Sequence, residues 1–269
     1  MKARTLVAAL IVAGGAFPIA GQPASPAPAV IQRSGFIFKG TIQKLASSNV
    51  SSLPENASTI IVRVDEILKA PPALASYRGR DVTVQLVQRG SRFRQGQQAV
   101  FYTTSLLYGE NLAVKEVTTV TAQADVRGLA SQIAQSERQA AEQALAARLV
   151  SSALVITGRV ADVAAFTSRE ASARRSEHDP ELWRAEVEVI AVLKGQRPGN
   201  SRVPVYFAHS TDERWILSPK YTPGQEGIFL LHTEEMARIA QPGYSTLDRL
   251  DFQPTSQLDV VRRLLTTRR

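Results

Sequence analysis

The 269-residue chain contains no cysteine and only three histidines, His178, His209 and His232. The absence of cysteine excludes a disulfide framework, a thiolate zinc site and a cysteine nucleophile. The histidines do not occur at the HxH or HxxxH spacing of a local metal site. His209 is followed by Asp212 and Glu213, which could hold a cation with it, but we interpret these residues as a solvated loop. We therefore expect neither a metal nor a cofactor.

The short motifs of common enzyme classes are also absent. The sequence contains no GxSxG elbow, no P-loop and no GxGxxG that leads into a helix. Its carboxylates are scattered rather than paired at the ends of strands. We therefore do not expect an enzyme, although a hydrolase whose catalytic residues meet only in the folded chain remains an alternative.

Long apolar runs are absent except near the N-terminus. There, Thr5–Phe17 follows Lys2 and Arg4 and precedes small residues and prolines. This order is typical of a secretory signal peptide, and the run is too short to span a bilayer comfortably. We predict a signal peptide over residues 1–24, with an uncleaved membrane anchor as the alternative. No later segment has the roughly 20 apolar residues of a spanning helix, so we expect a periplasmic or secreted protein that is not transmembrane after cleavage.

The remaining composition is that of a globular protein. Hydrophobic residues make up 44% of the chain and charged residues 21%, which allows each half to build a core. The length suits one large domain or two ordinary ones. The formal net charge is +8, but residues 33–119 hold 11 basic and 6 acidic residues whereas residues 151–250 hold 12 and 13. Only the first half is clearly basic.

The two halves of the chain repeat one pattern. Five blocks correspond in the same order, and their offsets of 118, 125, 121, 128 and 134 residues change only between blocks, as loop insertions require. The pairs are FKGTI (38–42) with ITGRV (156–160), VRVDEILKA (62–70) with VEVIAVLKG (187–195), VTV (82–84) with VPV (203–205), RQGQQAVF (94–101) with TPGQEGIF (222–229), and TAQADV (121–126) with TSQLDV (255–260). We therefore predict two copies of one small domain.

Each copy reads as a series of short strands. FIFKGTIQKL (36–45) and LVITGRVADV (154–163) alternate apolar and polar residues around a central glycine, which often marks a bulge or bend. Two further strand signals and a Gly-Gln turn lead to a fourth strand, and a fifth is clearer in the first copy than in the second. Five short strands with a bend in the first fit a small Greek-key barrel of the OB type, with an open sheet or sandwich as the alternative.

A helix is predicted after each barrel. Asp125 and Asp259 are suitable N-caps, and apolar residues follow them at helical spacing. The predicted fold is mainly β with helices: two tandem OB-like small β-barrels, each followed by a C-terminal helix. We expect the first barrel at residues 33–123, a helix at 124–150 that packs on it and links the copies, the second barrel at 151–258 and a C-terminal helix at 259–269.

The second copy has a recognisable order of strand and turn residues. They are Gly158, Val187, Val189, Leu193-Lys194-Gly195, Val203, Val205, Gly224 and Ile228-Phe229. This order resembles the netrin-like module, the OB barrel of the tissue inhibitors of metalloproteinases. The first copy is less similar, with Ala70 at the third position of the Leu-Lys-Gly motif. In the inhibitors a free N-terminal cysteine chelates the protease metal, and this chain has none, so the resemblance implies the fold but not that activity.

The most suggestive basic stretch is QRGSRFRQG (88–96), in the first copy. It interleaves Arg89, Arg92 and Arg94 with Phe93. OB barrels often bind oligonucleotides or oligosaccharides through aromatic and basic side chains, and arginine forks suit phosphate or carboxylate. We predict a binding site at these four residues, with a solvated loop that keeps the domain soluble as the alternative.

The second copy has a longer loop, STDERWILSPKYTPG (210–224), in place of this stretch. It carries Arg214, Trp215, Lys220 and Tyr221, and a large exposed aromatic in a long loop favours recognition. These residues complete the predicted binding site, although Trp215 could instead plug one end of the barrel.

From these features we predict a non-catalytic binding or assembly protein of the bacterial envelope or exterior. An inhibitor of an envelope or secreted hydrolase and a binder of anionic envelope polymer are the alternatives. The expected partner is an envelope protein or an anionic polymer, and nucleic acid is not expected for an exported protein.

Overall fold

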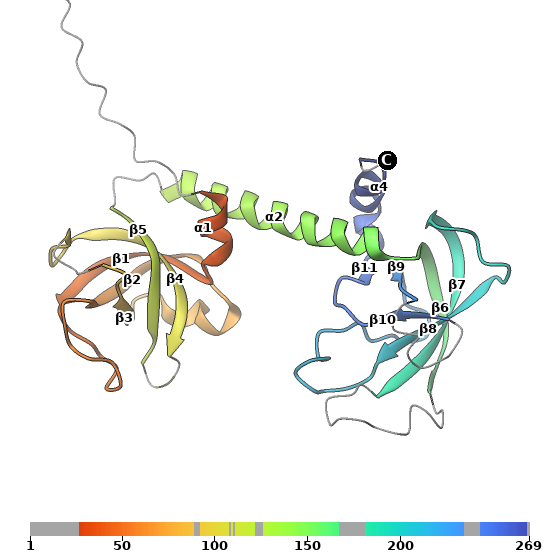
Figure 1. The fold of residues 1–269 in the computed structure, drawn as a ribbon, viewed down its shortest axis with the longest axis horizontal. Helices are drawn as coiled ribbons and strands as arrows, with labels where there is room; N and C mark the ends of the chain where they lie inside the picture. Colours follow the sequence, from red (N-terminus) through yellow and green to blue (C-terminus); the bar gives the residue numbers. More distant parts are fainter. Residues whose placement is uncertain are drawn as a thin grey trace, which may run out of the picture. The chain divides into compact units, whose positions relative to one another are not determined.

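Figure 1 shows the computed structural model of the chain, which describes residues 27–88, 92–107, 109, 111–121, 126–166, 181–233 and 243–267. The chain divides into two compact units, Met1–Glu137 and Arg138–Arg269, and each has its own sheet and cores. The predicted signal peptide, Arg89, Asp125 and His178 lie outside the described residues.

The first unit is a closed five-stranded barrel. Its elements are, in chain order, α1 (Pro28–Arg33), β1 (Phe36–Leu45), β2 (Thr59–Lys69), the 3₁₀ helix η1 (Pro72–Tyr77), β3 (Asp81–Gln85), β4 (Gln98–Leu107), β5 (Ala113–Thr121) and the first part of α2 (Val126–Ser151). The strands close in the order β1-β2-β3-β5-β4. β3 and β5 pair in parallel, and the other neighbours are antiparallel. A closed Greek-key barrel of five strands is the OB arrangement.

Alternation along the strands gives the first unit two cores. Phe38 of β1 points into the barrel and stacks on Phe101 of β4, with ring centroids 5.3 Å apart. The preceding residue of β1, Ile37, points the other way, as the period of a strand requires. The outward residues form a second cluster with both helices, and it comprises Ile31, Ile37, Val100, Tyr102, Leu129 and Ile133. Helices α1 and α2 therefore cover the outer face of β1 and β4.

The second unit is a curled six-stranded sheet. Its elements are the second part of α2, β6 (Leu154–Ala165), β7 (Leu182–Lys194), β8 (Arg202–Ala208), β9 (Glu226–Leu231), β10 (Tyr244–Thr246), β11 (Phe252–Gln253), the 3₁₀ helix η3 (Thr255–Gln257) and α4 (Leu258–Thr266). The sheet order is β10-β8-β7-β6-β9-β11, which keeps the strand neighbours of the first barrel.

The two sheets differ in how they close. The first is sealed by a long ladder between β4 and β5, whereas β9 and β10 are joined by the single bridge His232–Ser245. The short β10 ends at Thr246, and β11 pairs with β9 after the following turn. The predicted fold class, mainly β with two OB-like domains, is confirmed, but the second sheet is a half-barrel rather than a fully laddered barrel.

The duplication is visible in the backbone. In both copies the glycine of the Gly-Gln turn donates its N–H to a carbonyl of the first strand at 2.8 Å. Gly96 and Gly224 have φ of +78° and +86°, a conformation that favours glycine. Register shifts beside Gly40 and Gly158 confirm the bulge predicted in the first strand of each copy.

The C-terminal helix departs from the prediction at its start. α4 begins at Leu258 with Gln257 as its N-cap, whereas α2 is described from Val126 onward and residue 124 lies outside the described residues. Asp259 is not the cap because η3 leads directly into α4 and places this residue in the first turn. There its negative charge interacts favourably with the positive end of the helix dipole. The sequence pattern does not predict α1, because its six residues are too few to show helical periodicity.

The repeated Leu-Lys motif at the end of the second strand holds the helix that precedes each copy. Lys69 Nζ donates a hydrogen bond to the carbonyl oxygen of Ile31 in α1, at 3.1 Å. Lys194 Nζ donates three bonds of 2.5 to 2.8 Å to carbonyl oxygens at the end of α2, those of Leu149, Val150 and Ser152. A cation at this place bonds carbonyl groups at the end of a helix and is attracted by the negative end of the helix dipole. Each copy therefore includes a helix before its first strand as well as one after its last.

Candidate functional site

The basic stretch of the first copy is largely engaged by its own barrel. Arg92 forms an ion pair with Glu116 of β5, whose side chain is 2% exposed. The Arg92 guanidinium also lies over the ring of Phe93, 4.7 Å from its centroid. Phe93 is buried in the barrel core with Phe101. The interpretation of Phe93 as a surface aromatic is therefore wrong, because its ring fills the end of the barrel.

Glu116 determines how this end of the first barrel is built. Its carboxylate accepts the backbone N–H of Val87 at 3.0 Å and the Thr119 hydroxyl at 2.7 Å, besides the Arg92 guanidinium. A carboxylate can be buried in this way only when it is paired and hydrogen-bonded. No pattern in the sequence marks Glu116, since its main partners come from another segment. Of the predicted residues of this stretch that the structure describes, Arg94 has an exposed side chain that is not part of the barrel core.

The loop His209–Lys220, here called the 209–220 loop, joins β8 to β9 and is held by its own hydrogen bonds. The carboxylate of Asp212 accepts the backbone N–H of Arg214 at 2.8 Å, and the Asp212 carbonyl accepts that of Trp215 at 2.9 Å. Lys220 Nζ donates to the Trp215 carbonyl at 2.9 Å, and burial lowers the pKa of Lys220. Lys220 thus stabilises the turn that presents Trp215.

Tyr221 follows this loop and lies in the core. Its hydroxyl donates a 2.9 Å hydrogen bond to Thr246 Oγ1 of β10, and its ring lies 5.0 Å from Phe207 and 5.6 Å from Phe252. Burial raises the pKa of the Tyr221 hydroxyl. The interpretation of Tyr221 as an exposed loop aromatic is wrong, because it closes the end of the second sheet, which is the role considered above for Trp215.

The outer side of the 209–220 loop displays apolar and aromatic groups. Trp215 is half-buried, and the next two residues, Ile216 and Leu217, are 58% and 67% exposed. The Arg214 guanidinium lies 5.3 Å from the centroid of the Trp215 ring. Contiguous exposed apolar side chains indicate a contact surface. The predicted residues Arg214 and Trp215 lie on it, whereas Ile216 and Leu217 were visible in the sequence only as an apolar pair in a polar loop.

A second aromatic pair lies where this loop begins. Trp183 of β7 and His209 stack with ring centroids 4.1 Å apart and planes inclined by 19°. The pairing of β7 with β8 brings them together, because Trp183 lies opposite Phe207, two residues before His209. Trp183 is half-buried and His209 is exposed. Both tryptophans of the chain are therefore in or beside the 209–220 loop, a juxtaposition that depends on strand register and has no sequence motif.

His232 belongs to a buried ionic cluster in the second unit. The fully buried Asp251 accepts three hydrogen bonds of 2.6 to 2.9 Å from Arg148 of α2, and it lies 3.1 Å from His232 Nε2. It also accepts the N–H groups of Leu247 and Asp248 at 3.0 and 2.8 Å. These bonds tie the end of β9, the turn before β11 and α2 together, so we interpret the cluster as the closure of the second sheet.

Two further classes of site can be judged on the part of the chain that the structure describes. Within these residues, no group of three His, Asp or Glu side chains could hold a metal ion, so His209, Asp212 and Glu213 do not form such a group. None of the described helices has the length and apolar character needed to cross a membrane.

No family model matches the chain, and no curated protein matches it. Among solved structures, the chain is similar to the wild-type single-stranded DNA binding protein from Thermus aquaticus, with 13% sequence identity, a TM-score of 0.19, and coverage of 82% of this chain and 92% of that one. The OB-like fold expected from the sequence is confirmed by the strand order of the two sheets, and none of these comparisons points to the netrin-like module in particular.

Two predictions run against this finding and are corrected. We predicted a binding protein of the envelope or exterior and expected no nucleic-acid partner, whereas the solved structure is that of a protein that binds single-stranded DNA. At this TM-score the likeness carries no argument about the function of this chain. The envelope function and its two alternatives are not proposed again, and the case for nucleic acid rests on the geometry of the site.

Proposed function

We propose that the protein binds single-stranded nucleic acid through the 209–220 loop and Trp183. The observation that carries this proposal is the stacked pair of Trp183 and His209 at the start of the loop that presents Arg214 and Trp215. OB domains that bind single strands combine aromatic side chains, on which bases stack, with basic side chains that follow the backbone. Both kinds of side chain are present here.

Stacking should dominate the affinity over charge. Each stacked base contributes about 1–3 kcal/mol, and the loop offers the ring of Trp215 and the Trp183–His209 pair. The loop has few cations for phosphates, because Lys220 Nζ is bonded to the loop's own carbonyl groups. With Arg214 as the main phosphate contact, the logarithm of the affinity should fall with the logarithm of salt at a slope of about −0.7.

The test is fluorescence anisotropy of a labelled oligothymidylate titrated with the full chain. Trp215→Ala should weaken binding by about 1–3 kcal/mol, the contribution of one stacked base, and Arg214→Ala should remove most of the salt dependence. Arg94→Ala is the matched control, since Arg94 is an exposed arginine of the corresponding segment in the first unit. It should leave the affinity unchanged.

A duplex of the same length should bind more weakly, because its bases are already stacked on one another. The proposal is wrong if the oligothymidylate does not bind at low salt. It is also wrong if heparin competes fully while Trp215→Ala has no effect, since that result identifies a general polyanion surface. Circular dichroism of each variant establishes that the fold is retained.

Two finer expectations stay predictions. The resemblance to the netrin-like module rests on residues such as Lys194 and Gly224, which support the fold by holding α2 and forming a turn. Export through residues 1–24, with a periplasmic or secreted location, is tested by sequencing the N-terminus of the protein isolated from its host. A mature N-terminus near residue 24 would support export, and an intact N-terminus would contradict it.

A further inference from the structure

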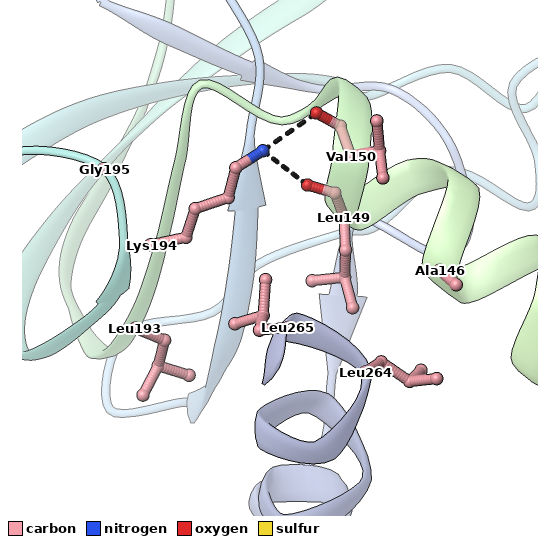
Figure 2. A pocket seen from close by; sticks show the side chains of 8 residues that line it. All are labelled: Ala146, Leu149, Val150, Leu193, Lys194, Gly195, Leu264 and Leu265. Carbon is pink, nitrogen blue, oxygen red and sulfur yellow. Dashed lines mark hydrogen bonds between the residues drawn. The ribbon is translucent and has the colours of Figure 1, made fainter. Parts of the chain in front are cut away.

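An apolar groove lies in the second unit beside the end of α2, and Figure 2 shows the side chains that line it. Its volume is about 290 Å³. The lining comes from α2, the end of β7 and α4, and includes Leu149, Val150, Leu193, Lys194, Leu264 and Leu265. Figure 2 places the Lys194 ammonium against the carbonyl oxygens that end α2.

The first unit shows what covers the corresponding place there. Lys69, the equivalent of Lys194, donates to the Ile31 carbonyl, and its Nζ also lies 3.5 Å from the carboxylate of Glu137 in α2. Ile133, one turn before Glu137 in the same helix, is 1% exposed, and Ser136, next to Glu137, is 4% exposed. A helical segment with an apolar face and a carboxylate therefore passes over this lysine.

The second unit has no such cover among its described residues. α4 corresponds to the first turns of α2, because its Val261 is buried against the outer face of β6 and β9. The helix α4 ends at Thr266. Lys194 has no carboxylate within 4.0 Å in the described part of the chain, and burial lowers its pKa. Val150, at the rim of the groove, is 59% exposed.

We propose that this groove docks an amphipathic helix of a partner protein that brings a carboxylate to Lys194. The apolar lining fits the apolar face of such a helix. The three N–H groups of the Lys194 ammonium are bonded to carbonyl oxygens, so the ammonium attracts the carboxylate through its charge rather than through a direct hydrogen bond. The best guide to the partner's chemistry is α2 itself, whose residues 126–144 carry Ile133 and Glu137 at the required spacing. The groove and the 209–220 loop share no residue, so this docking site is independent of the nucleic-acid site.

The probe is a capped, labelled peptide of residues 126–144, titrated into the full chain and followed by anisotropy. It should bind saturably, and Val150→Glu should weaken it by at least about tenfold, because an acidic side chain at the rim repels the Glu137 carboxylate of the peptide. Ile190→Glu is the matched control, since Ile190 is 57% exposed on β7 and does not line the groove. That variant should bind the peptide as the wild type does.

The charge contact is tested by changing the peptide. A peptide with Glu137→Gln should bind about 3- to 10-fold more weakly at low salt, and the two peptides should converge at high salt as the charges are screened. Absence of saturable binding to the full chain, or equal affinity for the Val150→Glu and Ile190→Glu variants, overturns the docking site. Equal affinity of the two peptides at low salt overturns the role of Lys194.

Discussion

The two units close the same end of their sheets with different chemistry. Phe93 and Tyr221 occupy equivalent positions, one residue before the Gly-Gln block. Their rings lie 6.2 and 5.4 Å from the equivalent phenylalanine of the fourth strand and are tilted by 45° and 44°. The same aromatic plug is thus present twice, and the difference lies in the polar groups around it.

In the first unit the plug has no hydroxyl, and the buried Glu116 beside it requires Arg92 as a counter-charge. In the second unit the strand register places Thr246 where Glu116 stands, and Thr246 accepts the Tyr221 hydroxyl. A neutral hydrogen bond satisfies the polar groups beside the aromatic ring in the second unit, whereas an ion pair does so in the first unit. The comparison teaches that a basic stretch is not yet a binding surface, because its arginine can be committed to a buried carboxylate.

The largest effect is expected where the second sheet closes through one bridge. Asp251→Ala removes the acceptor of Arg148, His232 and two backbone N–H groups and should destabilise the second unit by about 3–5 kcal/mol. Tryptophan fluorescence during urea unfolding measures this unit alone, because both tryptophans lie in it. Asp162→Ala, at an exposed residue of β6, is the control. A loss below about 1 kcal/mol would show that the sheet does not depend on this cluster.

Two variants with an intermediate expected loss of stability compare the ionic closure of the first unit with the neutral closure of the second. Arg92→Ala leaves the Glu116 carboxylate buried without its cation and should cost about 2–3 kcal/mol. Lys220→Ala, at the equivalent position, removes only hydrogen bonds to loop groups and should cost about 1 kcal/mol. Amide hydrogen exchange of β5 and β9 reports each unit separately. Equal losses for the two variants would contradict the distinction between an ionic and a neutral closure.

The smallest effect concerns Tyr102, which corresponds to Leu230 in the second copy. The Tyr102 hydroxyl is buried without a hydrogen-bond partner among the described residues, and burial raises its pKa from 10.0 to about 12. The folded state keeps this proton after the unfolded state has lost it. The contribution of Tyr102 to stability is therefore full below pH 10 and is lost as the pH rises toward 12. Tyr102→Phe should reduce that alkaline loss and change stability at pH 7 by about 1 kcal/mol or less. Urea unfolding between pH 7 and 12, followed by circular dichroism, decides this, and an unchanged alkaline slope would contradict it.

Much of the fold could be predicted from the sequence because strand periodicity is local. The first strand, FIFKGTIQKL, is β1 at the predicted bounds, and the Gly-Gln turns mark the start of the fourth strand in both copies. The extent of strand pairing could not be predicted, because the single bridge between β9 and β10 depends on the turn that Asp251 holds.

The candidate site was only partly predictable for the same reason. Arg214 and Trp215 stand out as a basic and an aromatic residue in one loop, whereas Trp183 joins them through strand register. The burial of Phe93 and Tyr221 had a usable signal, since an aromatic residue precedes the same turn in both copies. A repeated aromatic at a repeated turn indicates a core role more strongly than a binding role.

The most direct measurement is the intrinsic fluorescence of the full chain during titration with an oligothymidylate. Both tryptophans are in or beside the 209–220 loop, so the whole tryptophan fluorescence signal comes from the proposed site. We predict saturable quenching at low salt that persists at high salt with reduced affinity, and that is smaller in Trp215→Phe, which retains Trp183 as its reporter. Fluorescence that stays unchanged over the whole titration would contradict the assignment of this loop as a nucleic-acid site.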